Sequence, residues 1–108
     1  MRTYLGEFEQ LLLFALVQLE DDAYGGRVRE LIEARTGRAV SPGAIYTALD
    51  RLETRGLVSS SLGEATAQRG GKRKRYYRIE PAGAELLRQS HDALTRMARG
   101  LAPKLRPS

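Results

Sequence analysis

The sequence predicts a mainly α-helical domain with one small β-hairpin, an α+β fold. Apolar residues recur at helical spacing in three segments before Gly56. After Gly56 the spacing changes to the alternation typical of strands, and from Glu80 onward it is helical again. With 108 residues, the chain is long enough for one domain with a modest core.

The first helix is predicted over residues 5–19. One face carries Leu5, Phe8, Leu12, Ala15, Leu16 and Leu19, while Leu13 and Val17 form a second apolar stripe. A helix that is apolar on two sides needs cover on two sides, so we expect Leu13 and Val17 to contact a second subunit. The apolar run at 11–19 is too short to cross a bilayer, and acidic residues flank it. These features predict a cytoplasmic protein with no membrane contact.

The second helix is predicted to begin at an N-cap formed by Asp21 or Asp22 and to end at Gly37 in the left-handed conformation. The third helix has a stronger start signal, because Ser41 can cap free backbone N–H groups and Pro42 suits the first helical position. Its buried stripe is predicted to contain Ile45, Ala48, Leu49 and Leu52.

Two strands are predicted next, over residues 57–62 and 75–79, joined by a polar loop that contains Gly70 and Gly71. With Tyr77 and Ile79 facing inward, alternation turns Arg78 outward and places Arg75 on the inner side.

The last helix is predicted to begin at Glu80-Pro81 and to extend to residue 101. Leu87, Leu94 and Leu101 recur every seven residues, and Met97 lies among them, a spacing that favours pairing with another helix. Packing of this helix against its own domain is the alternative. We therefore predict a winged-helix unit at 1–80, a C-terminal dimerisation helix at 81–101 and a flexible tail at 102–108.

Charge is concentrated on the predicted hairpin. Residues 57–79 contain six basic side chains and one acidic side chain, a net charge of +5 that equals that of the whole chain. Such a patch indicates a polyanionic partner, although a solvated charged loop would look the same.

Three helices followed by a basic hairpin form the order of a winged helix-turn-helix, a fold in which one helix enters the major groove of DNA. The third helix leaves residues off its buried stripe that could reach base edges or phosphates: Ser41, Pro42, Gly43, Tyr46, Thr47 and Arg51. Tyr46 could instead be an ordinary surface tyrosine, and Arg51 could instead pair with Glu53 or Glu30.

In the hairpin we expect phosphate contacts from Arg69, Lys72, Arg73 and Lys74. Arg75 and Arg78 are weaker candidates, because strand alternation assigns them to the inner face and to solvent. Double-stranded DNA and a second copy of the chain are thus the predicted partners.

The residue types argue against an enzyme. There is no cysteine, and the single histidine, His91, is followed by Asp92, whose side chain on a helix points elsewhere. Gly70-Gly71-Lys72 lacks the spacing of a phosphate-binding loop. We therefore predict no catalytic residues, no metal site and no cofactor.

In combination, several motifs resemble the PadR family of bacterial transcriptional regulators: residues 22–25 (DAYG), 41–53 (SPGAIYTALDRLE), 56–58 (GLV), 69–79 (RGGKRKRYYRI) and Gly83. The resemblance implies a homodimeric winged-helix repressor that binds a near-palindromic operator, with Tyr46 on the reading helix and the last helix in the dimer interface. The family usually has threonine where this chain has Glu80. With one C-terminal helix, the chain is similar to the short branch of the family.

Two other functions fit the same fold. A repressor that responds to an aromatic or drug-like effector is compatible with DNA binding, but the sequence indicates no effector pocket. A winged-helix module that binds proteins would need less concentrated charge on the hairpin than residues 57–79 carry.

Overall fold

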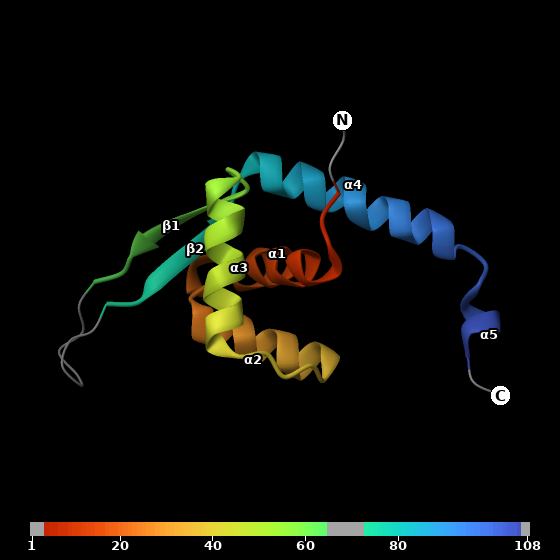
Figure 1. Cartoon of the computed structure of the whole chain (residues 1–108), viewed down its shortest axis with the longest axis horizontal. Helices are drawn as coiled ribbons and strands as arrows, with labels where there is room; N and C mark the ends of the chain where they lie inside the picture. The colour runs from red at the N-terminus through yellow and green to blue at the C-terminus, as the bar shows by residue number, and fades with distance from the viewer. Residues whose placement is uncertain (1–3, 65–72, 107–108) are drawn as a thin grey trace.

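The computed structural model describes residues 4–64 and 73–106. Helices α1 (Glu7–Leu19), α2 (Gly25–Thr36) and α3 (Pro42–Thr54) pack together, and a short 3₁₀ turn η1 (Glu20–Asp22) links the first two. The antiparallel strands β1 (Val58–Leu62) and β2 (Arg75–Ile79) follow. Helix α4 (Pro81–Ala98) then leads to the single-turn helix α5 (Ala102–Leu105), and the hairpin and α5 lie at opposite ends of the molecule (Figure 1). The predicted mainly helical fold with one hairpin is confirmed.

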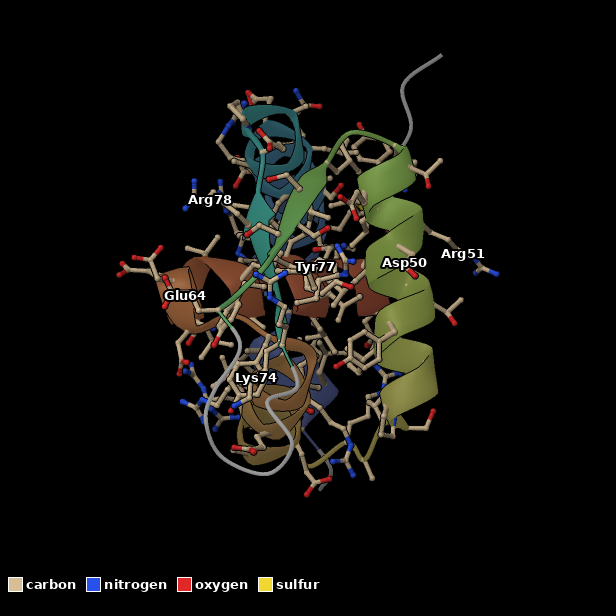
Figure 2. The ribbon with its side chains drawn as sticks, turned by 90° about the vertical axis from the view of Figure 1, so that its left-hand side faces the viewer. Asp50, Arg51, Glu64, Lys74, Tyr77 and Arg78 are labelled. Carbon is tan, nitrogen blue, oxygen red and sulfur yellow. The ribbon has the colours of Figure 1, made fainter. Side chains whose placement is uncertain are left out.

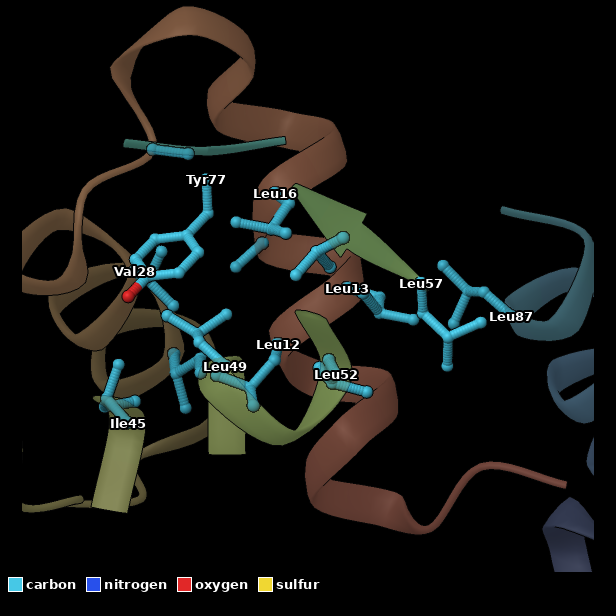
Figure 3. Close-up of a cluster of buried hydrophobic side chains, with 14 of the residues drawn as sticks. Leu12, Leu13, Leu16, Val28, Ile45, Leu49, Leu52, Leu57, Tyr77 and Leu87 are labelled. Atoms are coloured by element: carbon cyan, nitrogen blue, oxygen red, sulfur yellow. The ribbon is translucent and has the colours of Figure 1, made fainter. Parts of the chain in front are cut away.

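One hydrophobic core joins all these elements except η1 and α5. Leu12 and Leu13 of α1, Val28 of α2, and Ile45, Leu49 and Leu52 of α3 are its largest fully buried side chains. Tyr77 enters from β2 and Leu87 from α4 (Figure 3). The buried stripe predicted for the third helix is confirmed, with Ala48 only partly buried.

The sequence predicted the capping residue at three helix ends, and the structure tests each of them. Ser41 Oγ accepts the Ala44 N–H at 3.1 Å, and Gly37 is left-handed with φ 74°, so both of these predictions are confirmed. The N-cap predicted at Asp21 or Asp22 is wrong, because these residues form η1 and Tyr24 caps α2. The reason is long-range: the Ala23 carbonyl accepts the Tyr77 N–H at 2.8 Å and Tyr24 forms an antiparallel bridge with Tyr76, which holds Tyr24 extended beside β2.

Two helix ends also differ from the prediction. Helix α1 begins at Glu7 rather than Leu5, because the Leu5 N–H donates to Ser90 Oγ of α4 at 2.9 Å and the Gly6 N–H donates to Glu9 Oε1. Helix α4 ends at Ala98, before Leu101, where Gly100 turns the chain with φ 79°. Residues 102–105, predicted as part of a tail, form α5.

Helix α4 docks on the rest of the domain through its first half. A Cβ at Gly83 would overlap the Leu57 carbonyl oxygen and lie 3.0 Å from the carbonyl carbon, so only glycine permits this close approach. Ser90, also buried, fixes the segment that precedes α1. Within residues 4–64 and 73–106, no helix is long and apolar enough to span a membrane.

Candidate nucleic-acid interface

Helix α3 presents a solvent-exposed face opposite its buried stripe. Ser41, Pro42, Gly43 and Thr47 are all exposed, and the sequence assigned each of them to a DNA contact. Gly43 has open space around it, since a Cβ there would meet nothing within 4 Å. The first two turns of α3 therefore form a small-residue surface that another molecule can approach closely.

Tyr46 lies at the junction of α3 and α2. Its side chain is 43% exposed, and its ring stands against Gly25: a Cβ built on Gly25 would lie 2.5 Å from Tyr46 Cζ. The ring is thus held by the first residue of α2 while part of it stays open to solvent. Gly25 was not predicted as a site residue, although Gly25 belongs to the motif at residues 22–25 that could have indicated it.

Arg51 also faces solvent, and Figure 2 shows it pointing away from the hairpin. Its two alternative partners are otherwise engaged, because Glu53 accepts from Ser60 and Glu30 accepts from Arg27. Within the described part of the chain, Arg51 forms no side-chain ion pair. Its charge is therefore available to a ligand.

The basic side chains of β2, and of the two residues that precede it, point to different sides of the hairpin. Arg73 and Lys74 are both exposed, and Lys74 Nζ lies 4.1 Å above the centre of the Tyr24 ring. Arg75 Nη1 donates to Ser60 Oγ at 3.1 Å, on the side of the hairpin that faces α3. Arg78 faces the other way, 3.7 Å from Asp21 (Figure 2). This matches the predicted alternation; Arg69 and Lys72 lie outside the described residues.

Tyr77 connects the hairpin to α3 from beneath. Only 2% of the residue is exposed, and its hydroxyl donates to Asp50 Oδ1 at 3.4 Å. Burial, followed by the negative charge of Asp50, raises the pKa of Tyr77 to about 12. The hydroxyl therefore stays protonated near neutral pH and can donate to the carboxylate.

An aromatic pair supports the other side of the hairpin. The rings of Tyr24 and Tyr76 meet edge to face with centroids 5.7 Å apart, and a Cβ on Gly63 would lie 2.6 Å from Tyr76 Cε1. Tyr24, just before α2, and Asp50 and Glu53 of α3 thus contact the hairpin from two sides.

The residues predicted for a dimer interface divide into two groups. Leu13 and Leu87 are buried within the protomer, so the surface proposed below is built on the exposed residues. Val17, Leu94, Met97 and Leu101 are exposed, Leu94 by 58% and Met97 by 77%. His91 is exposed and meets the Phe14 ring edge-on, with centroids 5.3 Å apart.

Comparison with known proteins identifies relatives of this arrangement. A family model described as the transcriptional regulator PadR-like family matches residues 13–89. The transcriptional regulator Rv3488 of Mycobacterium tuberculosis is 41% identical over an alignment of 68 residues that covers 61% of this chain. The match spans 58% of the length of that relative.

Solved structures agree with the family match. A PadR family transcription regulator from Clostridium difficile R20291 has a TM-score of 0.75 at 23% identity, covering 94% of this chain and all of that one. A PadR family transcriptional regulator from Eggerthella lenta DSM 2243 has a TM-score of 0.67 at 27% identity, covering 94% of this chain and 88% of that one. At 23% identity, the similarity to the first structure shows a shared fold. The second structure, at 27% identity, agrees with the family match as well.

Proposed function

Because this chain belongs to the transcriptional regulator PadR-like family, we propose that it is a sequence-specific DNA-binding protein that acts in the cytoplasm as a homodimeric repressor. Helix α3 would enter the major groove, and the basic hairpin would bind the adjacent phosphates as a wing. The observation that carries the proposal is that α3, whose start is exposed, is joined through Asp50 and Glu53 to a hairpin whose segment has a net charge of +5.

The two surfaces supply different parts of binding. Lysine and arginine neutralise phosphates and provide affinity for any sequence, whereas base edges are read in the major groove. The exposed polar groups near the start of α3 are Ser41, Tyr46 and Thr47, and Thr47 could contact a thymine methyl group. Sequence preference is therefore assigned to α3 and general affinity to the wing.

The apolar surface of α4 supports the homodimer. Exposed Leu94 and Met97, with Val17 on α1, would be buried by a second copy. A two-fold dimer places two copies of α3 about one turn of DNA apart, ~34 Å, which matches a near-palindromic operator.

The wing is tested by the salt dependence of binding to duplex DNA. Alanine at Arg69, Lys72 and Arg73 should weaken binding to all sequences and make the plot of log K against log salt shallower by roughly 0.9 for each phosphate that is no longer neutralised. Alanine at Arg96, Arg99 and Lys104 removes the same charge from the far end of the molecule and serves as the matched control.

An equal change of slope in both triple variants would show that net charge, rather than the wing, governs binding. If the unaltered protein binds no duplex DNA at low salt, the protein-interaction function becomes the better explanation of the fold.

A further inference from the structure

A chain of three polar side chains joins α3 to the wing. Ser60 Oγ lies 2.9 and 2.8 Å from the two carboxylate oxygens of Glu53, near the end of α3. Arg75 Nη1 donates to the same Ser60 Oγ at 3.1 Å from the opposite strand. The cation of the wing and the anion of the helix therefore meet at a single hydroxyl.

A hydroxyl group is suited to this place because it can accept from a cation and donate to an anion at one atom. The guanidinium donates to Ser60, and the Ser60 proton is directed to Glu53. Each bond polarises the other, since the charges at the two ends have opposite sign. The chain thus fixes the direction of the Arg75 side chain relative to α3.

The backbone that carries Ser60 and Arg75 is also held in place. Ser60 is the register partner of Tyr77, which is buried and bonded to Asp50. Arg75 lies two residues before Tyr77 and on the same face of β2. The guanidinium is therefore tied to α3 through the strand and through its side chain.

This arrangement orients the Arg75 side chain and leaves most of its N–H donors without a side-chain partner among the described residues. A guanidinium has five N–H donors, and among the described residues Arg75 donates one side-chain bond, to a neutral oxygen. Arg75 is exposed and forms no ion pair within residues 4–64 and 73–106. Arg78, on the other face of the same strand, is directed toward Asp21 instead.

We propose that Ser60 and Glu53 are positioning residues that hold Arg75 in the angle between α3 and the wing, where its free N–H groups bind a phosphate of duplex DNA. The inference rests on the proposed DNA-binding function. It gives Arg75 a phosphate contact that strand alternation alone did not favour, and it gives the acidic residue Glu53 a part in binding a polyanion.

The test is a double-mutant cycle measured by DNA-binding titration. The probe is a mixed-sequence duplex of roughly three helical turns of ~34 Å each, because phosphate contacts need no particular sequence. Arg75→Gln should weaken binding and make the salt slope shallower by about 0.9. Ser60→Ala should weaken binding roughly threefold to tenfold, the scale of one hydrogen bond, but have less than about a twofold effect when Arg75 is already glutamine.

Matched variants separate positioning from general damage to the hairpin. Ser60→Thr keeps the hydroxyl and should restore binding, whereas Ser61→Ala alters the neighbouring, outward-facing serine and should leave binding unchanged. Arg78→Gln removes the same charge from the other face and should change the slope less than Arg75→Gln. Glu53→Gln provides a second cycle with Arg75→Gln, and its effect should also disappear in that background.

Each result decides the inference. If Ser60→Ala and Glu53→Gln weaken binding equally with arginine or glutamine at position 75, the two residues do not act through Arg75 and the inference is overturned. The same follows if Arg75→Gln leaves the salt slope unchanged while the unaltered protein binds DNA. If the unaltered protein does not bind the duplex, the proposed function itself fails, an outcome distinct from additivity in the cycle.

Discussion

The two ends of the molecule, which Figure 1 places at the hairpin and at α5, expose cations and apolar side chains in different proportions. At the hairpin end, exposed side chains such as Arg73, Arg75 and Arg78 are cationic. At the α4–α5 end, Leu94, Met97 and Leu105 are exposed and apolar. Cations are stable in water and attract a polyanion over a distance set by salt, whereas exposed apolar groups gain only when another surface excludes water. The difference therefore assigns the two proposed associations, with DNA and with a second copy, to separate surfaces of the molecule.

Gly83→Ala should have the largest effect, because this residue lies where the start of α4 packs against Leu57, between the two ends. The added methyl group would overlap the Leu57 carbonyl and push α4 away from the residue that precedes β1. Overpacking should destabilise the fold by about 2–3 kcal/mol, although alanine improves helix propensity by ~1 kcal/mol. Urea unfolding at a fixed protein concentration measures this change.

Gly43→Ala is the control for that experiment, since a Cβ there meets nothing within 4 Å. It should leave the stability unchanged or raise it by up to ~1 kcal/mol. Equal stability of the Gly83 and Gly43 variants would contradict the close approach of α4 to Leu57.

The apolar end is tested by Leu94→Glu combined with Met97→Glu. Two charges on this surface should convert the proposed dimer to a monomer at micromolar concentration, weakening dimerisation by at least about 100-fold, because burying each unpaired carboxylate costs several kcal/mol. Light scattering measures the mass. The monomer should keep its helical circular dichroism, since neither side chain belongs to the core.

Thr95→Glu adds a carboxylate to another, exposed face of α4 and should leave the dimer intact. An unaltered protein that stays monomeric at high concentration would remove the homodimer from the proposed function. DNA affinity should fall in the double-glutamate variant even though the wing is unchanged, because one half-site then binds alone.

The same comparison shows what the sequence could predict. Local signals specify α3 well: the Ser41 cap, the Pro42 start and the buried stripe are all in the structure. The seven-residue spacing of Leu87, Leu94 and Leu101 does not distinguish packing within the protomer from packing against a second protomer. Leu87 is buried where Gly83 lets the first half of α4 approach Leu57, a contact that helical spacing does not predict.

The candidate site divides in the same way. Alternation along one strand predicted that Arg75 and Arg78 face opposite sides. The Tyr24 cap and the bond from Arg75 to Ser60 depend on residues that meet only after the chain has folded, such as Ala23 with Tyr77. Local periodicity contains no information about such pairs, so alternation alone ranked Arg75 among the weaker candidates.

The smallest expected effect concerns Tyr77, which lies beneath the hairpin end and has a pKa raised to about 12. An unfolded tyrosine has a pKa of about 10, so the folded state holds the proton more tightly. This contribution to stability is complete below about pH 10 and is lost as pH rises from about 10 to about 12, where the unfolded chain releases its proton first. Tyr77→Phe should lose that pH dependence while changing stability at neutral pH by less than about 1 kcal/mol.

Ultraviolet absorbance of tyrosinate provides the measurement. Tyr77 should ionise above the ordinary range of a tyrosine, and Tyr77→Phe should remove that last step from the titration. Tyr76→Phe, on the neighbouring and less buried residue, is the control and should leave the step in place. A last step that persists in Tyr77→Phe would show that the Tyr77 hydroxyl is not the desolvated partner of Asp50. Among the side-chain hydrogen bonds of the described residues, the hairpin would then be joined to α3 through Ser60 and Glu53. The position of Arg75 would depend more heavily on its hydrogen bond to Ser60.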